Sequence, residues 1–297
     1  MLGASLTDRI GNTPLLRIEL EGGPIYAKAE WYNPGGSVKD RAAWRMLAEG
    51  ETSGRLTHAQ TILEATSGNT GIALAMLGAA RGYQVRLVLP ANVSPERKRI
   101  LAAFGPELTY TDPGEGTDGA IGRARELYAA APERYFYTDQ YSNPANWQAH
   151  YHGTAEEIWR QTEGRITHFM AALGTSGTFI GTARRLKELR PSIRCVSLQP
   201  DTPLHGIEGT KHMASALVPA IYDATVADED RAVSTEAAYL MVKRVARAHG
   251  LLIGVSSGAA LAAAAQLRNE LGPEAMIVTV LPDNADKYLS EKFWETR

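Results

Sequence analysis

The chain has 297 residues, of which 44% are hydrophobic and 22% charged, with a formal net charge of −2. This is ordinary globular usage and supplies one large or two modest cores. No block of like charges is present, so nothing points to nucleic acid or an anionic membrane surface as a partner. The N-terminus lacks the pattern of a secretory signal, and the longest apolar runs, such as residues 259–265, are too short to span a bilayer.

Short β-branched runs alternate with longer helical patterns along the whole chain. In the first half, strands are predicted at residues 61–65, 84–90, 107–111 and 134–140. Helices are predicted at residues 71–80, 95–104, 120–130 and 144–161. In the second half, strand patterns cover residues 166–174, 193–200 and 275–282, and helices are predicted at 179–189, 235–249 and after Ser257. A helix is also predicted to start at Lys39.

Near-continuous apolar strands that alternate with helices are typical of parallel sheets covered on both faces, so the fold class is α/β. The pattern pauses near residues 140–145 and then resumes, which indicates two α/β lobes. The only cysteine, Cys195, lies in a predicted buried strand, where an inert core thiol is the favoured interpretation. No intrachain disulfide can form, and we expect a cytoplasmic protein.

Two strand-to-helix loops combine glycines with hydroxyl side chains, and such loops gather where ligands bind in open α/β sheets. In ATSGNTG (residues 65–71), the backbone N–H groups and the hydroxyls of Thr66, Ser67 and Thr70 suit a carboxylate, although an N-cap turn without a ligand is the alternative. In GTSGT (residues 174–178), two glycines and three hydroxyls suit a phosphate. This second loop matches neither the P-loop nor the dinucleotide fingerprint.

Two further features are weak when each is taken alone. In GVSSGAA (residues 254–260), the serines can simply cap the helix that follows. Lys39 follows a Gly-Gly-Ser turn at a predicted helix start, where a cation is disfavoured by the partly positive helix end. A solvated surface lysine is the ordinary interpretation of Lys39 on its own. Together with the two loops, however, these features describe a phosphorylated aldehyde cofactor that holds an amino acid.

At these residues the sequence resembles the fold-type II pyridoxal-phosphate (PLP) enzymes, and within them the cysteine synthases, or O-acetylserine sulfhydrylases. The resemblance is closest to the B-type, or CysM-like, branch. It runs from residue 10 to residue 290 and is carried by IGNTPLLRI, NPGGSVKDRAA, EATSGNTGIALAM, GYQVRLVLP, DQYSNPANWQAHYHGTAEEIW, RITHFMAALGTSGT, GVSSGAA and DKYLS. It implies two parallel-sheet α/β lobes of the tryptophan synthase β-like architecture. We predict a smaller mobile domain at residues 36–149, which carries Lys39 and the 66–70 loop, and a larger one at 1–35 plus 150–297, which carries the phosphate loop.

The resemblance implies pyridoxal 5'-phosphate as cofactor and a role for each motif residue. Lys39 would form the Schiff base and act as general base at the substrate Cα. Asn69 would hydrogen-bond the ring hydroxyl oxygen, and Ser256 would face the pyridine nitrogen, with Ser257 less favoured. The phosphate would be held by Gly174, Thr175, Ser176, Gly177 and Thr178. The substrate carboxylate would be held by Thr66, Ser67, Asn69, Thr70 and Gln140.

The reaction implied is β-replacement on O-acetyl-L-serine or O-phospho-L-serine through an α-aminoacrylate, with sulfide giving L-cysteine or thiosulfate giving S-sulfocysteine. The alternatives within the same fold are cystathionine β-synthase and serine/threonine dehydratase. Lys211 and His212 could meet an anionic donor or a phosphate leaving group, or be ordinary exposed basic residues. Asp283 could tune protonation near the cofactor ring or be a solvated loop carboxylate.

The remaining partners are inferred from the family and from the pattern of the histidines. A homodimer is expected from the resemblance, and a complex with serine acetyltransferase is not expected, because B-type relatives usually lack it. His150 and His152 lie two apart in a predicted helix and point to different faces, so no metal site is predicted.

Overall fold

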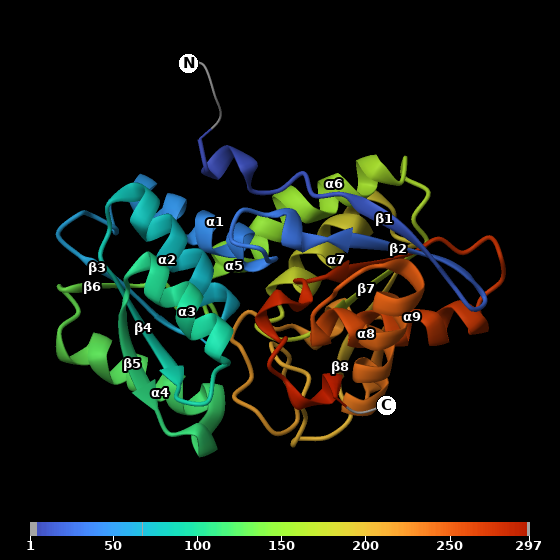
Figure 1. The fold of residues 1–297 in the computed structure, drawn as a ribbon. Helices are drawn as coiled ribbons and strands as arrows, with labels where there is room; N and C mark the ends of the chain where they lie inside the picture. Colours follow the sequence, from blue (N-terminus) through green and yellow to red (C-terminus); the bar gives the residue numbers. More distant parts are fainter. Residues whose placement is uncertain (1–4, 67, 296–297) are drawn as a thin grey trace.

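The computed structural model describes residues 5–66 and 68–295 and contains two β-sheets, each flanked by helices on both faces (Figure 1). The four-stranded sheet is entirely parallel, in the order β5 (Glu107–Thr111), β4 (Val85–Pro90), β3 (Thr61–Ala65), β6 (Tyr135–Tyr137). The six-stranded sheet has the order β1 (Leu15–Leu20), β2 (Gly23–Ala29), β10 (Ile277–Leu281), β7 (His168–Ala172), β8 (Arg194–Pro200), β9 (Glu229–Val233). The predicted α/β class with parallel sheets is therefore confirmed, with one antiparallel pair, β1–β2.

Helices cover both faces of the four-stranded sheet because alternate strand residues are apolar on each side. One face carries α1 (Lys39–Thr52), α2 (Asn69–Arg81) and α3 (Pro95–Phe104), whose apolar side chains form one core cluster with Ile62 and Leu87. The other face carries α4 (Gly116–Ala130), which forms a second cluster with Leu63 and Val88. The start of α3 has the expected capping chemistry, since Ser94 accepts from the backbone N–H of Arg97 and Pro95 follows the cap.

The six-stranded sheet is enclosed in the same way. On one face lie α8 (Thr235–His249) and α9 (Val255–Glu270), and on the other lie α6 (Ala155–Gln161) and α7 (Gly177–Leu189) (Figure 1). Cys195 is fully buried in β8, and burial raises the pKa of its thiol to about 12, which agrees with the predicted inert core role. The short helical turns are η1 (Thr7–Arg9), η2 (Glu30–Tyr32), η3 (Pro113–Glu115), η5 (Ala224–Val226), η6 (Ala285–Lys287) and η7 (Lys292–Trp294).

The predicted helix at residues 144–161 is present but irregular in its middle. It consists of α5 (Pro144–Ala149), a π-helical segment η4 (His150–Thr154) and α6. α5 and the π-helical segment pack closely against α7: a Cβ on Gly181 would lie 2.0 Å from the carbonyl oxygen of Trp147 in α5 and 2.9 Å from Cβ of His150. Inserted π-helical turns of this kind frequently accompany functional sites.

Strand order places two switch points at the carboxyl ends of the sheets, where ligands bind in α/β folds. In the smaller sheet, the chain runs outward from β3 to β5 and returns at β6 beside β3, so the loops after β3 and β6 meet. In the larger sheet, β7 is flanked by β8 on one side and by β10 on the other, so the loops after β7 and β10 meet. These four loops, together with the first residues of α2 and α7, comprise residues 66, 68–70, 138–140, 173–178 and 282–283.

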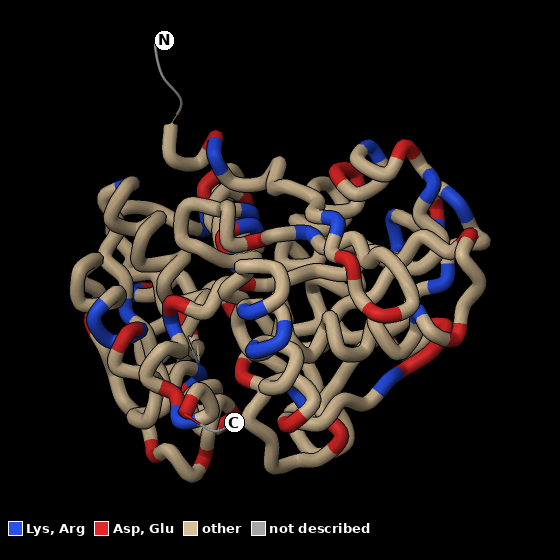
Figure 2. Tube along the Cα trace, turned by 45° about the vertical axis from the view of Figure 1, so that its right-hand side comes forward, with Lys and Arg blue, Asp and Glu red and all other residues tan. Residues whose placement is uncertain are grey.

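Charges of both signs are interspersed along the chain, as expected from the small net charge (Figure 2). Among residues 5–66 and 68–295, no helix is both long enough and apolar enough to cross a bilayer. The C-terminal segment returns to the smaller sheet's helices, because Ser290 donates from its backbone N–H and hydroxyl to Glu96 at 3.0 and 2.8 Å. The hydroxyl of Ser94 likewise donates to the carbonyl oxygen of Lys287 at 2.9 Å.

Candidate active site

Lys39 is the first residue of α1, as the sequence predicts, and its side chain lines an internal cavity. The glycine turn before it is fixed by Asp40, whose carboxylate accepts from the N–H of Gly35 at 2.5 Å. In the described part of the chain, the Lys39 amine has no hydrogen-bond or ion-pair partner. Burial lowers the pKa of this amine, and the negative charge of Asp283 opposes that effect. The Lys39 amine therefore loses its proton more readily than the amine of an exposed lysine.

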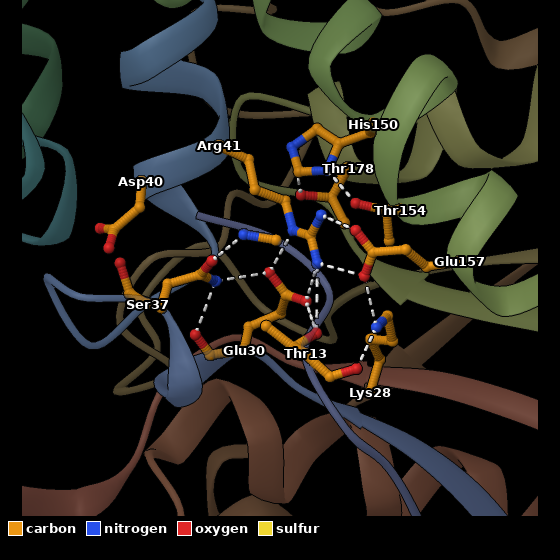
Figure 3. A network of polar contacts seen from close by, with 12 residues as sticks. Thr13, Lys28, Glu30, Ser37, Asp40, Arg41, His150, Thr154, Glu157 and Thr178 are labelled. Atoms are coloured by element: carbon orange, nitrogen blue, oxygen red, sulfur yellow. Dashed lines mark hydrogen bonds and ion pairs between the residues drawn. The ribbon is translucent and has the colours of Figure 1, made fainter. Parts of the chain in front are cut away.

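A buried charge network fixes the helix that carries Lys39 (Figure 3). Two residues after Lys39, the guanidinium of Arg41 donates to Glu30 at 2.6 and 2.8 Å and to Glu157 at 2.6 and 2.8 Å. Lys28 pairs with Glu157 at 2.6 Å and also donates to the carbonyl oxygen of Thr13. The planar fork of arginine matches two carboxylates at once. The network therefore ties α1 to β2 and α6, which carry Lys28 and Glu157.

The loop after β3 forms the start of α2, as expected for a carboxylate receptor. Thr66 is buried, and its hydroxyl oxygen accepts from the N–H groups of Gly68 at 3.0 Å and Gly71 at 3.2 Å. Thr70 donates its hydroxyl proton to Gln140 Oε1 at 2.7 Å, so the loops after β3 and β6 meet as the topology requires. The hydroxyl of Thr66 thus organises the loop backbone. Ser67 lies outside the described residues.

The loop after β7 has the backbone of an anion-binding nest. Ser176 adopts a left-handed conformation with φ of 69°, and its buried hydroxyl has no hydrogen-bond partner in the described part of the chain. Thr175 accepts a hydrogen bond from Asn146 Nδ2 at 2.9 Å, and Thr178 Oγ1 lies 3.3 Å from His150 Nε2. Gly177 has no room for a Cβ, which would lie 2.1 Å from Asn146 Oδ1.

The loop after β10 brings Asp283 into the site. Asp283 is fully buried, so the solvated-carboxylate alternative is wrong. Its Oδ2 accepts from Asn69 Nδ2 at 2.7 Å and from the Tyr288 hydroxyl at 2.7 Å, whereas Oδ1 has no partner among the described residues. Ser257 donates to the backbone oxygen of Asp283 at 3.0 Å, while Ser256 lines the cavity. Ser256, and not Ser257, therefore lines the same cavity as Lys39.

The predicted residues meet in two adjoining cavities. Both are lined by Lys39, Asn69, Gly174, Thr175, Glu208, Gly209 and Thr210. The first also holds Thr66, Thr70 and Gln140, and the second holds Ser176, Thr178 and Ser256. A larger open cavity of about 710 Å³ shares Glu208–Lys211 with the first and forms the entrance. The loop predicted to receive a carboxylate and the loop predicted to receive a phosphate thus line adjoining cavities, and Lys39 lines both.

The entrance is bridged by ion pairs that were not predicted from the sequence. Arg97 of α3 pairs with Glu208, and its guanidinium lies 4.7 Å from the centre of the Tyr288 ring. Lys211 is buried and pairs with Asp118 of α4 at 2.6 Å, so it is not an ordinary exposed lysine. These pairs join residues 93 or more positions apart, and no local pattern announces them.

His212 lies at the entrance, where its Nδ1 is 2.8 Å from the hydroxyl of Ser215.

Asn146 is another site residue that sequence reasoning missed. It connects Gln140 to the phosphate loop by donating to the Gln140 carbonyl oxygen at 2.7 Å and to Thr175. The only local signal for Asn146 was its position two residues into the helix that follows Asn143.

The donor and acceptor groups of this site fit pyridoxal phosphate. The buried Ser176 hydroxyl without a partner lies in a nest at the N-terminus of α7, which suits the phosphate. The Asn69 Oδ1 without a partner and the amine of Lys39 line the cavity beside it, where an aldehyde-bearing ring would lie. The fold and the site together define a PLP-dependent enzyme of fold type II.

Comparison with known proteins agrees. Residues 6–283 match the family model described as pyridoxal-phosphate dependent enzyme. The chain is 52% identical to a cysteine synthase of Aquifex aeolicus, over 95% of this chain and 89% of that protein, and 40% identical to cysteine synthase B of Pseudomonas aeruginosa, over 99% and 98%. The crystal structure of a cysteine synthase from Entamoeba histolytica superposes with a TM-score of 0.92 at 34% identity, covering 100% of this chain and 92% of that one.

The chain therefore belongs to the pyridoxal-phosphate dependent enzyme family, among its cysteine synthases. Its cofactor is pyridoxal phosphate, and its substrates are small molecules. The resemblance and the two-lobed architecture predicted from the sequence are confirmed.

Proposed function

We propose that this chain makes L-cysteine from an O-activated L-serine, either O-acetyl-L-serine or O-phospho-L-serine, with sulfide as the second substrate. Thiosulfate in place of sulfide would give S-sulfocysteine. The observation that carries the proposal is the Lys39 amine between a carboxylate-receptor loop and a phosphate-binding loop. The curated relatives are cysteine synthases, which favours this reaction over the cystathionine β-synthase and dehydratase alternatives.

The cofactor, when bound, withdraws electrons from the substrate Cα, so that the Cα proton can be removed and the acetate or phosphate group on Cβ can leave. Lys39 takes that Cα proton and returns it to the same carbon after the sulfur has added to Cβ. Burial favours this role because it lowers the pKa of the amine. Ser256 would present a neutral hydroxyl to the ring nitrogen of the cofactor. A hydroxyl would not hold a proton on that nitrogen as a carboxylate would, which would favour loss of the β-group over transamination.

The substrate carboxylate is placed against the start of α2, where N–H groups point out of the helix. Thr66, Ser67, Asn69 and Thr70 bind it, and Thr70 does so through its backbone N–H, because its hydroxyl donates its proton to Gln140 Oε1 at 2.7 Å. Gln140 is assigned the role of holding Thr70 in place. The cofactor phosphate is held by Gly174, Thr175, Ser176, Gly177 and Thr178. We propose that residues 36–149 move as a smaller domain and close the 66–70 loop over the carboxylate, which excludes water from the reacting atoms.

The chain's assembly and location follow from the same proposal. We expect a cytoplasmic homodimer, as in the family that the sequence resembles. Light scattering on the purified protein checks the dimer directly.

The experiment that tests the proposed function crosses two activated serines with two sulfur donors. O-acetylserine and O-phosphoserine are each incubated with sulfide and with thiosulfate, and the amino-acid products are identified by mass spectrometry. Formation of cysteine or S-sulfocysteine in at least one combination, abolished by Lys39→Ala, supports the proposal. Failure of all four combinations with cofactor-loaded protein would contradict it.

A further inference from the structure

A further buried carboxylate lies behind the substrate loop. Glu64 is the fourth residue of β3 and is fully buried. Among the described residues it forms no ion pair. Its carboxylate instead accepts from four groups: the N–H of Ala65 at 2.9 Å, the N–H of Gln140 at 3.1 Å, Gln140 Nε2 at 3.4 Å, and the hydroxyl of Thr138. The donors of Thr138 and Gln140 belong to the loop after β6, so the buried acid fixes that loop in place.

The chemistry of the carboxylate decides which way the Gln140 amide points. Carboxylate oxygens accept, so the amide NH₂ group must face Glu64 and the neighbouring carbonyl oxygen of Ala65, to which it donates at 2.9 Å. The amide oxygen is then left facing Thr70, from which it accepts at 2.7 Å. In the reverse orientation, the amide oxygen would face two other acceptors.

We infer that Glu64 is a positioning residue for the amino-acid substrate: it fixes the amide of Gln140, and through the Gln140–Thr70 hydrogen bond the start of α2, without contacting the substrate. The inference rests on the proposed function, in which the loop at residues 66–70 binds the substrate carboxylate. It adds a residue to that function, because Glu64 reaches the site only through Gln140.

The charge of Glu64 gives the inference a pH signature. Burial raises the pKa of its carboxyl to about 8, and the negative charge of Asp139 adds to this, whereas the hydrogen bonds from Thr138, Gln140 and Ala65 oppose it. The phenols of Tyr137 and Tyr141 also face it, and no cation among the described residues forms an ion pair with Glu64.

The neutral acid can keep the same contacts. It donates to Thr138 Oγ1, which can donate onward to the Leu63 carbonyl oxygen at 3.2 Å. Ionisation above pH 8 therefore leaves the Gln140 amide in place but adds a buried negative charge behind the substrate carboxylate. Substrate affinity should fall as this charge appears.

The test compares Glu64→Gln with Glu126→Gln, an exposed acid on α4 that serves as the matched control. L-Serine is titrated against the cofactor-loaded proteins by the change in cofactor absorption, and KM and kcat are measured with O-acetylserine. A glutamine at position 64 brings an NH₂ group against backbone N–H donors, so one buried donor loses its acceptor. The cost of that unpaired donor corresponds to about a tenfold rise in the L-serine dissociation constant and in KM. The value of kcat should stay within about twofold of the wild-type value. Above pH 8 the substrate affinities of the variant and the wild type should become more similar, because Glu64 of the wild type ionises and its affinity falls.

Three results would overturn the inference: an L-serine affinity of Glu64→Gln equal to that of the control variant, a loss confined to kcat, or a ratio of variant to wild-type L-serine affinity that does not change with pH. A double-mutant cycle distinguishes the positioning role from a purely structural one. If Glu64 acts through Gln140, adding Glu64→Gln to Gln140→Ala should cause no further loss of L-serine affinity. If Glu64→Gln fails to fold, Thr138→Val removes one donor to Glu64 and should shift KM in the same direction by a smaller factor. Wild-type protein that makes no cysteine but binds L-serine would contradict the proposed function alone, whereas no response to L-serine would contradict both.

Discussion

Replacing Arg41 by methionine should destabilise the protein strongly, because the guanidinium is shared by two buried carboxylates. Glu30 is fully buried and the Glu157 side chain is 8% exposed, so neither can be rehydrated without local opening. Removing one partner of a buried pair costs about 3–5 kcal/mol, since the remaining charges stay desolvated. For a chain of this size, each kcal/mol lowers the melting temperature by about 2–4 °C, so Arg41→Met should melt roughly 10 °C below the wild type.

Differential scanning fluorimetry at neutral pH checks this value, with Arg55→Met as control. Arg55 pairs with Glu49 at the surface, where the two side chains are 56% and 40% exposed, and its loss should cost less than about 1 kcal/mol. Equal melting temperatures for Arg41→Met and Arg55→Met would refute the reasoning. The same measurement at low pH supplies a second check on the network.

Burial alone would raise the pKa of the Glu157 carboxyl, but hydrogen bonds and charge from Arg41 and Lys28 hold it at about 2. A carboxyl whose folded pKa lies below its ordinary value of 4.5 stabilises the fold fully above pH 4.5 and loses that contribution as the pH falls toward 2. The difference between wild type and Arg41→Met should therefore shrink over this interval. A constant difference from pH 7 to pH 2 would contradict this assignment.

Two further substitutions test the site itself. Asp283→Asn removes the negative charge that raises the pKa of the Lys39 amine. Cofactor-free protein should therefore take up pyridoxal phosphate at half its maximal rate at a lower pH than the wild type. An unchanged pH profile of the uptake rate would contradict this role of Asp283. Gly174→Ala should abolish cofactor uptake, because its Cβ would lie 2.2 Å from the carbonyl oxygen of Gly209, whereas Gly122→Ala on α4, with open space around it, should bind cofactor normally. Equal uptake by the two alanine variants would show that the phosphate loop tolerates the added carbon.

Local patterns predicted most of the strands and helices well. The strands at residues 61–65 and 107–111 and the helices at 95–104 and 235–249 have the predicted bounds, because apolar periodicity and capping residues are encoded within each segment. The hairpin β1–β2 and the strand β9 were missed. β1 and β9 are edge strands with exposed polar residues, which dilute the apolar signal. The irregular turn at residues 150–154 was also missed, because it depends on close packing against α7.

The loops of the site were predictable for the same reason, since glycines and hydroxyls mark them within a few residues. Their partners were not. Asn69 meets Asp283 across 214 positions, and Arg97 meets Glu208 across 111 positions. Such contacts arise only once both sheets have folded and their switch points face one another. The same applies to Lys211, whose burial and pairing depend on α4.

Peptide mapping after reduction tests the central claim most directly. Cofactor-loaded protein is treated with borohydride, digested, and analysed for a peptide that carries the cofactor mass. The account predicts that this mass lies on the Nζ of Lys39 and that Lys39→Ala shows no modified peptide. A cofactor adduct on another lysine, with Lys39 recovered unmodified, would contradict it.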